Sequence, residues 1–124
     1  MNIIISNASD LPIYLQIVNQ IKDAILSGKL EENQMLPSMR ALAKDLNISF
    51  ITTKRAYEEL EKQGMINTVP GKGCYVSPFN KELVYEAKIR EIEDKLEESI
   101  NLSRVIGLTK DELIEILDSL YEGE

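Results

Sequence analysis

The chain has 124 residues, of which 44% are apolar and 28% charged, a composition typical of a globular protein. Its formal net charge is -7, and it contains one cysteine, Cys74, and no histidine. Without histidine, most zinc sites and the Ser/His/Asp and Cys/His catalytic groups are excluded, and no nucleotide-binding fingerprint is present, so we expect neither an enzyme nor a bound metal or cofactor.

Apolar residues spaced three and four apart predict a first helix over residues 12–27. Its apolar face consists of Tyr14, Ile17, Ile21, Ala24 and Ile25. Asp10 is placed to cap the start of this helix, and Pro12 suits its first turn, where a missing N–H costs nothing. Gly28 suits its end.

Two shorter helices are predicted after a loop over residues 29–36. Ser38 can cap the first, and Ser49 can cap the second, which runs to about Gln63. The expected inward positions are Leu42, Ala43 and Leu46 in the first helix and Thr53, Ala56, Tyr57 and Leu60 in the second. With the short turn at Asn47-Ile48 between them, the two helices form a helix-turn-helix.

A β-hairpin is predicted next, because β-rich residues 65–69 and 74–76 flank the turn Pro70-Gly71-Lys72-Gly73. A hairpin directly after a helix-turn-helix is the arrangement of a winged helix. Cys74 is interpreted as a strand residue rather than a redox switch, because apart from Lys72 no neighbour in sequence would activate its thiol.

The end of the chain predicts two further helices, from about Asn80 to Val105 and from Thr109 to about Leu120, separated by Gly107. The second begins with a capping box of Thr109 and Glu112, for which Leu108 and Leu113 are placed as a hydrophobic staple. Their apolar stripes are Tyr85, Ile89, Ile92, Leu96 and Ile100 in the first and Leu113, Ile116, Leu117 and Leu120 in the second. Two helices offer too few neighbours to bury these stripes, so we expect a second copy of the chain to cover them. Binding of a small effector to the first stripe is the alternative.

The predicted fold class is mainly α with a small β-hairpin: a winged helix-turn-helix DNA-binding domain over residues 1–78, then a two-helix C-terminal dimerisation tail over residues 79–124. Residues 1–78 contain eight basic and eight acidic residues, whereas residues 79–124 contain six and thirteen. The acidity therefore belongs to the tail, and the neutral first part can still bind phosphate through local basic positions. No segment is long enough to be a signal peptide or to cross a bilayer, so we expect a cytoplasmic protein that makes no membrane contact.

Particular residues also resemble those of a known family. They are Pro12-Ile13-Tyr14, Gln16-Ile17, Gln20-Ile21-Lys22, Gly28, Leu36-Pro37-Ser38, Arg40, Leu42-Ala43, Arg55 to Glu61, Gly64 and Gly71 to Val76. Over about residues 10–77 the chain resembles the GntR family of bacterial transcription regulators, and Gly107-Leu108-Thr109 with Glu112-Leu113 resembles its short YtrA-like subfamily. The resemblance implies a dimeric repressor, often of a neighbouring transporter operon, with no large effector domain. A two-fold dimer predicts a pseudo-palindromic operator with half-sites about 10 bp or a multiple apart.

The candidate DNA-binding residues lie on the helix-turn-helix and the hairpin turn. They are Ser38, Arg40, Ser49, Phe50, Ile51, Thr52, Lys54, Arg55, Gly71, Lys72 and Gly73. Arg40 can contact a phosphate or a guanine edge, or instead form a surface salt bridge with Asp45 or Glu61. We expect phosphate contacts by Arg40, Lys54 and Lys72 to dominate affinity.

Several of these residues have a second interpretation. Ser49 can contact phosphate or serve only as a cap, Thr52 is the better contact, and Thr53 can face the core. Lys54 and Arg55 point about 100° apart, so one can face DNA while the other pairs with Glu58 or Glu59. Gly71 and Gly73 permit a tight turn close to the duplex, or simply an ordinary hairpin tip.

The chain departs from the family at two places. Phe50-Ile51 stands where the family usually has polar residues, and these side chains can contact thymine methyl groups or pack on a neighbouring surface. Asn33 replaces a usual glycine, and because asparagine tolerates positive φ we expect the loop to keep its conformation. Phe50-Ile51 and the acidic charge balance also support an alternative, a winged-helix protein-interaction module without sequence-specific DNA binding.

Overall fold

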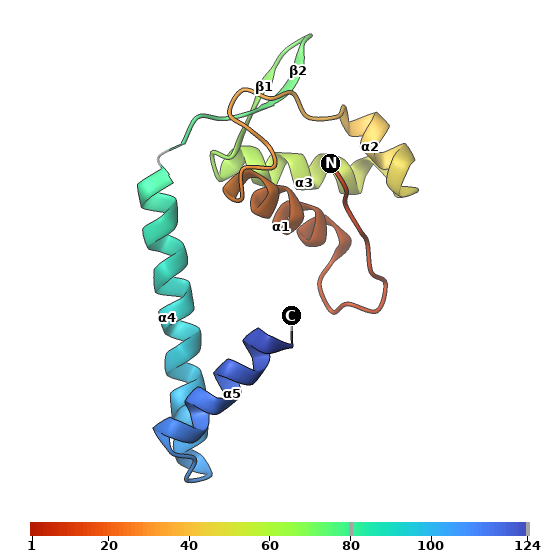
Figure 1. The fold of residues 1–124 in the computed structure, drawn as a ribbon. Coiled ribbons are helices and arrows are strands. Elements are labelled where there is room, and N and C mark those ends of the chain that lie inside the picture. The colour runs from red at the N-terminus through yellow and green to blue at the C-terminus, as the bar shows by residue number, and fades with distance from the viewer. Residues whose placement is uncertain (80, 124) are drawn as a thin grey trace. The chain divides into compact units, whose positions relative to one another are not determined.

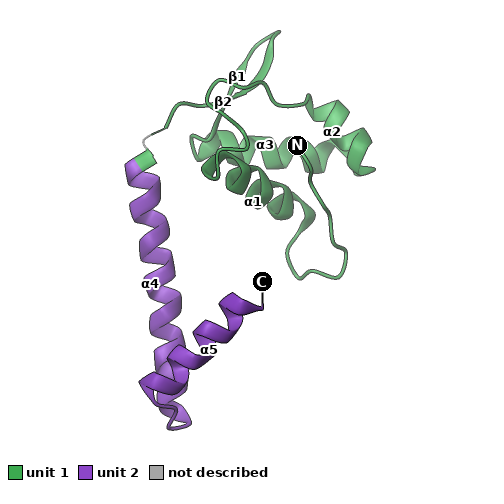
Figure 2. Ribbon diagram, viewed as in Figure 1, with its two compact units in different colours: residues 1–81 green, residues 82–124 purple. Residues whose placement is uncertain are grey.

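The computed structural model describes residues 1–79 and 81–123, and the chain divides into two compact units, residues 1–81 and 82–124 (Figure 2). The elements in chain order are α1 (Ile13–Leu26), α2 (Met39–Leu46), α3 (Phe50–Lys62), β1 (Ile66–Val69), β2 (Gly73–Val76), α4 (Lys81–Val105) and α5 (Lys110–Glu122) (Figure 1). This order confirms the expected fold class of helices with one small hairpin. Asn80, the expected start of the long helix, lies outside the described residues, and the last helix continues past the expected Leu120 to Glu122.

Helix α1 contributes one side of the core of the first unit. Ile17, Val18, Ile21 and Ile25 are buried, as the spacing predicts for three of them. The expected cap is wrong, since the N-cap is Pro12 and no side chain caps the helix. Instead of Asp10, the buried Gln16 organises the preceding segment: its amide donates to the carbonyl oxygens of Ser6 and Leu11, both at 2.9 Å, and its oxygen accepts from the Ser6 N–H.

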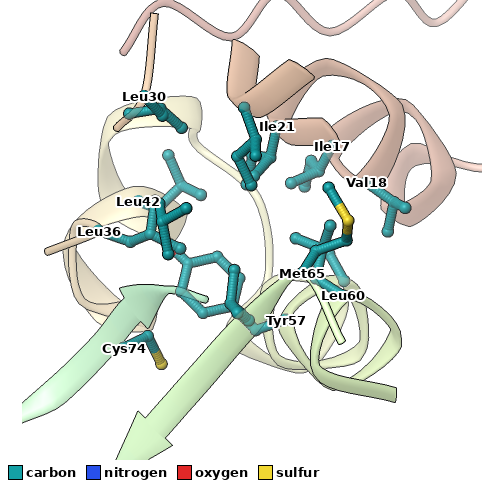
Figure 3. Packing of buried hydrophobic residues seen from close by; sticks show 14 residues of the cluster. Ile17, Val18, Ile21, Leu30, Leu36, Leu42, Tyr57, Leu60, Met65 and Cys74 are labelled. Atoms are coloured by element: carbon teal, nitrogen blue, oxygen red, sulfur yellow. The ribbon is translucent and has the colours of Figure 1, made fainter. Parts of the chain in front are cut away.

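Helix α3 packs on α1, and α2 packs on α3 to complete the helix-turn-helix. The inward residues Thr53, Ala56, Tyr57 and Leu60 of α3 are all buried, as their spacing predicts. In α2, Leu42 and Ala43 are buried but Leu46 is only half-buried. Figure 3 shows the side chains of α1, α2 and α3 pointing into one common interior, with the ring of Tyr57 among them.

The hairpin pairs β1 and β2 antiparallel, with Ile66 opposite Val76 and Val69 opposite Gly73. The loop before α2 adds to this sheet, which the sequence pattern did not predict. The Asn33 N–H donates to the Val76 carbonyl at 2.8 Å, and the Leu36 N–H donates to the Cys74 carbonyl at 2.8 Å. Asn33 has φ 66°, which confirms that asparagine sustains the left-handed conformation expected there. The loop thereby joins the helix-turn-helix to the hairpin.

The second unit contains α5 and nearly all of α4. The capping box is present: the Thr109 hydroxyl accepts from the Glu112 N–H, and the Glu112 carboxylate accepts from the Thr109 N–H. The hydrogen bond that the Glu112 carboxylate accepts from the Thr109 N–H, and a second that it accepts from the Thr109 hydroxyl at 3.0 Å, lower the pKa of Glu112. Gly107, with φ 71°, lies in the short connection between the helices. Among the described residues, no helix combines the length and apolar character needed to cross a membrane.

Candidate nucleic-acid interface

Two serine side chains cap the N-termini of the two helices of the helix-turn-helix. The Ser38 hydroxyl accepts from the Ala41 N–H at 3.1 Å, and the Ser49 hydroxyl accepts from the Thr52 N–H at 3.1 Å. Between the helices, Asn47 takes a left-handed conformation with φ 54°. Each cap contributes about 1 kcal/mol to helix stability. The caps therefore set where α3 begins and which side chains its first turn presents.

The two threonines in the first turn of α3, Thr52 and Thr53, differ in burial and in their hydrogen bonds. Thr53 is fully buried and its hydroxyl donates to the Ser49 carbonyl at 3.3 Å, so it faces the core as expected. Thr52 is half-buried and its Oγ1 lies 2.8 Å from Ser49 Oγ. Ile51 is the most exposed residue of this turn, with 78% of its surface accessible. The turn thus offers an apolar side chain and paired hydroxyls to a partner.

Arg40 and Phe50 form a contact that the sequence pattern does not predict. The guanidinium carbon of Arg40 lies 5.1 Å from the centroid of the Phe50 ring, within cation–π range. Within the described part of the chain, Arg40 forms no salt bridge with Asp45 or Glu61. Glu61 instead accepts a hydrogen bond from the Thr68 hydroxyl at 2.8 Å. Phe50 therefore packs against the neighbouring helix α2 while 39% of its surface stays exposed.

Lys54 and Arg55 have different partners, as their angular separation predicts. Lys54 Nζ lies 3.8 Å from the Glu58 carboxylate, and both side chains are more than half exposed. Such a surface pair is worth at most about 1 kcal/mol, so Lys54 remains able to exchange it for a phosphate. Among the described residues Arg55 forms no salt bridge with an acidic neighbour, and its guanidinium carbon lies 3.8 Å from the ring centroid of Tyr14 on α1. This contact ties α3 to α1.

The hairpin turn has the geometry of a tight, exposed tip. Gly71 and Gly73 have φ 75° and 123°, conformations that L side chains rarely adopt, so glycine is required at both. Lys72 is exposed between them, and its N–H donates to the Val69 carbonyl at 2.9 Å. The turn therefore presents a single cation on a well-defined backbone.

Tyr57 connects α3 to the segment that leads into α2. Its phenol donates to the Pro37 carbonyl at 2.7 Å. Burial, and to a lesser degree the adjacent Cys74, raises the pKa of this phenol above its ordinary value. The sequence pattern identified Tyr57 as a core residue only, because periodicity reports burial and does not identify hydrogen-bond partners.

The second unit carries an apolar surface of its own. Ile92 and Leu96 on α4 are 53% and 48% exposed, and Ile116 and Leu117 on α5 are 47% and 44% exposed. An open apolar groove of about 510 Å³ lies between the two helices, and its lining residues fall within residues 96–120. Four other stripe residues are also exposed: Tyr85, Ile89, Ile100 and Leu120. The remaining one, Leu113, is half-buried. Soluble monomeric proteins rarely leave so many large apolar side chains exposed to water on one surface.

Comparisons with known proteins cover either the first unit or most of the chain. Residues 13–76 match the model of the family described as "Bacterial regulatory proteins, gntR family". The HTH-type transcriptional repressor YtrA of Bacillus subtilis is 36% identical over 107 residues, covering 86% of this chain and 82% of that protein. A GntR family transcriptional regulator from Listeria monocytogenes has a similar structure, with a TM-score of 0.74 and 30% identity over 93% of this chain and 98% of that one. The AraR DNA-binding domain, solved in complex with operator ORX1, has a TM-score of 0.54 and 29% identity over 60% of this chain and 92% of that one.

Proposed function

Because the chain belongs to the GntR family of bacterial transcription regulators, we propose that it is a dimeric repressor that binds a pseudo-palindromic operator. The observation that carries the proposal is the exposed first turn of α3, fixed by the Ser49 cap and followed along the chain by a tight basic hairpin turn. A helix-turn-helix places the start of its second helix against base edges, and a wing contacts the adjacent backbone.

The residues of the interface divide by the kind of DNA contact they can make. Lys54 and Lys72 are exposed amines suited to phosphate. Arg40 offers a guanidinium that fits a phosphate or a guanine edge, and Ile51 offers an apolar surface for a thymine methyl group. Arg55 is occupied by Tyr14, so we assign it to the support of α3 and not to DNA.

The dimer is proposed from the stripes of α4 and α5. A second copy would cover the exposed isoleucines and leucines on both helices, which the short second unit cannot cover by itself. Two-fold symmetry then places two α3 helices in successive major grooves, so the operator has half-sites about 10 bp or a multiple apart. The family resemblance points to a neighbouring transporter operon as the target and to the cytoplasm as the place of action.

Hydroxyl-radical footprinting on the region upstream of the chain's own gene tests this proposal. We expect two protected segments related by inverted sequence and centred about one helical turn or a multiple apart. Deleting the gene should raise the transcript level of the adjacent operon. A single protected segment bound by one subunit would contradict the dimer, and an unchanged or lower transcript level would contradict repression.

A further inference from the structure

The contact between Arg40 and Phe50 joins the two helices of the helix-turn-helix at the proposed DNA surface. Arg40 is the second residue of α2, and Phe50 is the first residue of α3. The guanidinium carbon lies 5.1 Å from the ring centroid, and both residues are exposed. An arginine at the start of a short surface helix would otherwise sample many rotamers.

A guanidinium group that stacks on an aromatic ring uses only its face in the contact. A ring under a guanidinium engages its π face, whereas the five N–H donors lie in the plane of the group and point outward from its edge. An arginine held in this way keeps the two parallel donors that bind O6 and N7 of guanine. Within the described residues Arg40 has no carboxylate partner that would compete for those donors.

We propose that Phe50 is a positioning residue for base readout, which holds the guanidinium of Arg40 in the orientation that contacts a guanine edge. The inference rests on the proposed function and concerns how its interface reads sequence. Restricting the arginine before binding reduces the conformational entropy lost in the complex, which is the usual benefit of preorganisation. The apolar residue at position 50 thereby acts through Arg40 and not by its own contact with thymine.

A double-mutant cycle separates the two roles of Phe50. The probe is the tightest duplex that the full-length wild-type protein selects from a randomised library. Phe50→Leu keeps an apolar side chain but removes the ring, and it should weaken binding by about five- to thirtyfold, the equivalent of one exposed cation–π contact in each of the two subunits. In the Arg40→Ala background, measured at low salt so that phosphate contacts sustain binding, Phe50→Leu should have no further effect.

Controls distinguish this result from general damage to the helix. Phe50→Tyr retains the ring and should bind as the wild type does, whereas Ile51→Ala, on the same turn, should weaken binding equally with and without Arg40. Replacing single guanines of the duplex by 7-deazaguanine removes the N7 acceptor. At one position in each half-site this should cost the wild-type protein more affinity than it costs the Phe50→Leu variant. Thermal melts check that all variants are folded.

The free protein provides a readout that does not depend on DNA. The side-chain CH₂ protons of Arg40 should be shifted upfield by the ring in the wild type and in Phe50→Tyr, and should lose that shift in Phe50→Leu. Selection of no duplex would overturn the proposed function and the inference together. Selection of a duplex with equal Phe50→Leu losses in both backgrounds, or the absence of the upfield shift, would overturn the inference alone.

Discussion

Replacing Leu96 on α4 by alanine should weaken the proposed dimer strongly. Leu96 is 48% exposed in the single chain, so about half of its surface remains to be buried by a partner. Full burial of a leucine is worth about 1.5–3 kcal/mol, and two-fold symmetry places two copies of Leu96 in the interface. The substitution should therefore cost the dimer roughly 1.5–3 kcal/mol, which corresponds to about a tenfold to hundredfold increase in the dissociation constant.

Sedimentation over a range of protein concentrations measures this constant directly. Leu102→Ala is the matched control, because Leu102 lies on the same helix and is 70% exposed, but six residues from Leu96 it points about 120° away from the stripe. We expect Leu102→Ala to leave dimerisation unchanged. Equal dissociation constants for the two variants would refute the assignment of the stripe as the dimer interface, and circular dichroism must show that both retain their helices.

Two further substitutions test the hairpin turn and the support of α3. Lys72→Ala should weaken DNA binding and make the slope of log K against log salt shallower by about 2, since it removes one phosphate contact from each subunit; an unchanged affinity and slope would show that the wing does not contact DNA. Tyr57→Phe should lower the free energy of unfolding by about 1 kcal/mol by removing the hydrogen bond to Pro37, as measured by urea denaturation. Tyr75→Phe is its control, because that phenol makes only a long, exposed bond of 3.4 Å, and equal losses would contradict the role of Tyr57. Since the folded state raises the pKa of Tyr57, its contribution is present below pH ~10 and is lost as the pH rises further, so wild-type stability should fall more steeply there than that of Tyr57→Phe.

Local patterns were sufficient to predict most of the helices. The spacing of Thr53, Ala56, Tyr57 and Leu60 identified the buried face of α3, because helical periodicity directly reports which side meets the core. Ser38, Ser49 and Thr109 were recognised as caps, because each is followed by a helical run that needs an acceptor at its first N–H groups.

Interactions between distant segments were not predictable in the same way. Pairing of residues 33–36 with β2 depends on where the loop is brought by the folded helices, and the loop itself has no alternating apolar pattern. The Asp10 cap failed because Gln16 and Pro12 together organise the start of α1. The contacts of Arg40 with Phe50 and of Arg55 with Tyr14 depend on side-chain rotamers and on the placement of neighbouring helices. These are the contacts that decide which residues remain available to DNA.

The central claim, that this chain is a sequence-specific DNA-binding regulator, is tested most directly by salt-dependent binding to a fluorescent duplex carrying its own upstream region. Four phosphate contacts from Lys54 and Lys72 of two subunits, or six if Arg40 also binds phosphate, predict a slope of log K against log salt of about -4 to -5. We predict tight binding with that slope that resists unlabelled random DNA. Equal, weak binding to every duplex, or no binding, would contradict the claim and favour the protein-interaction alternative.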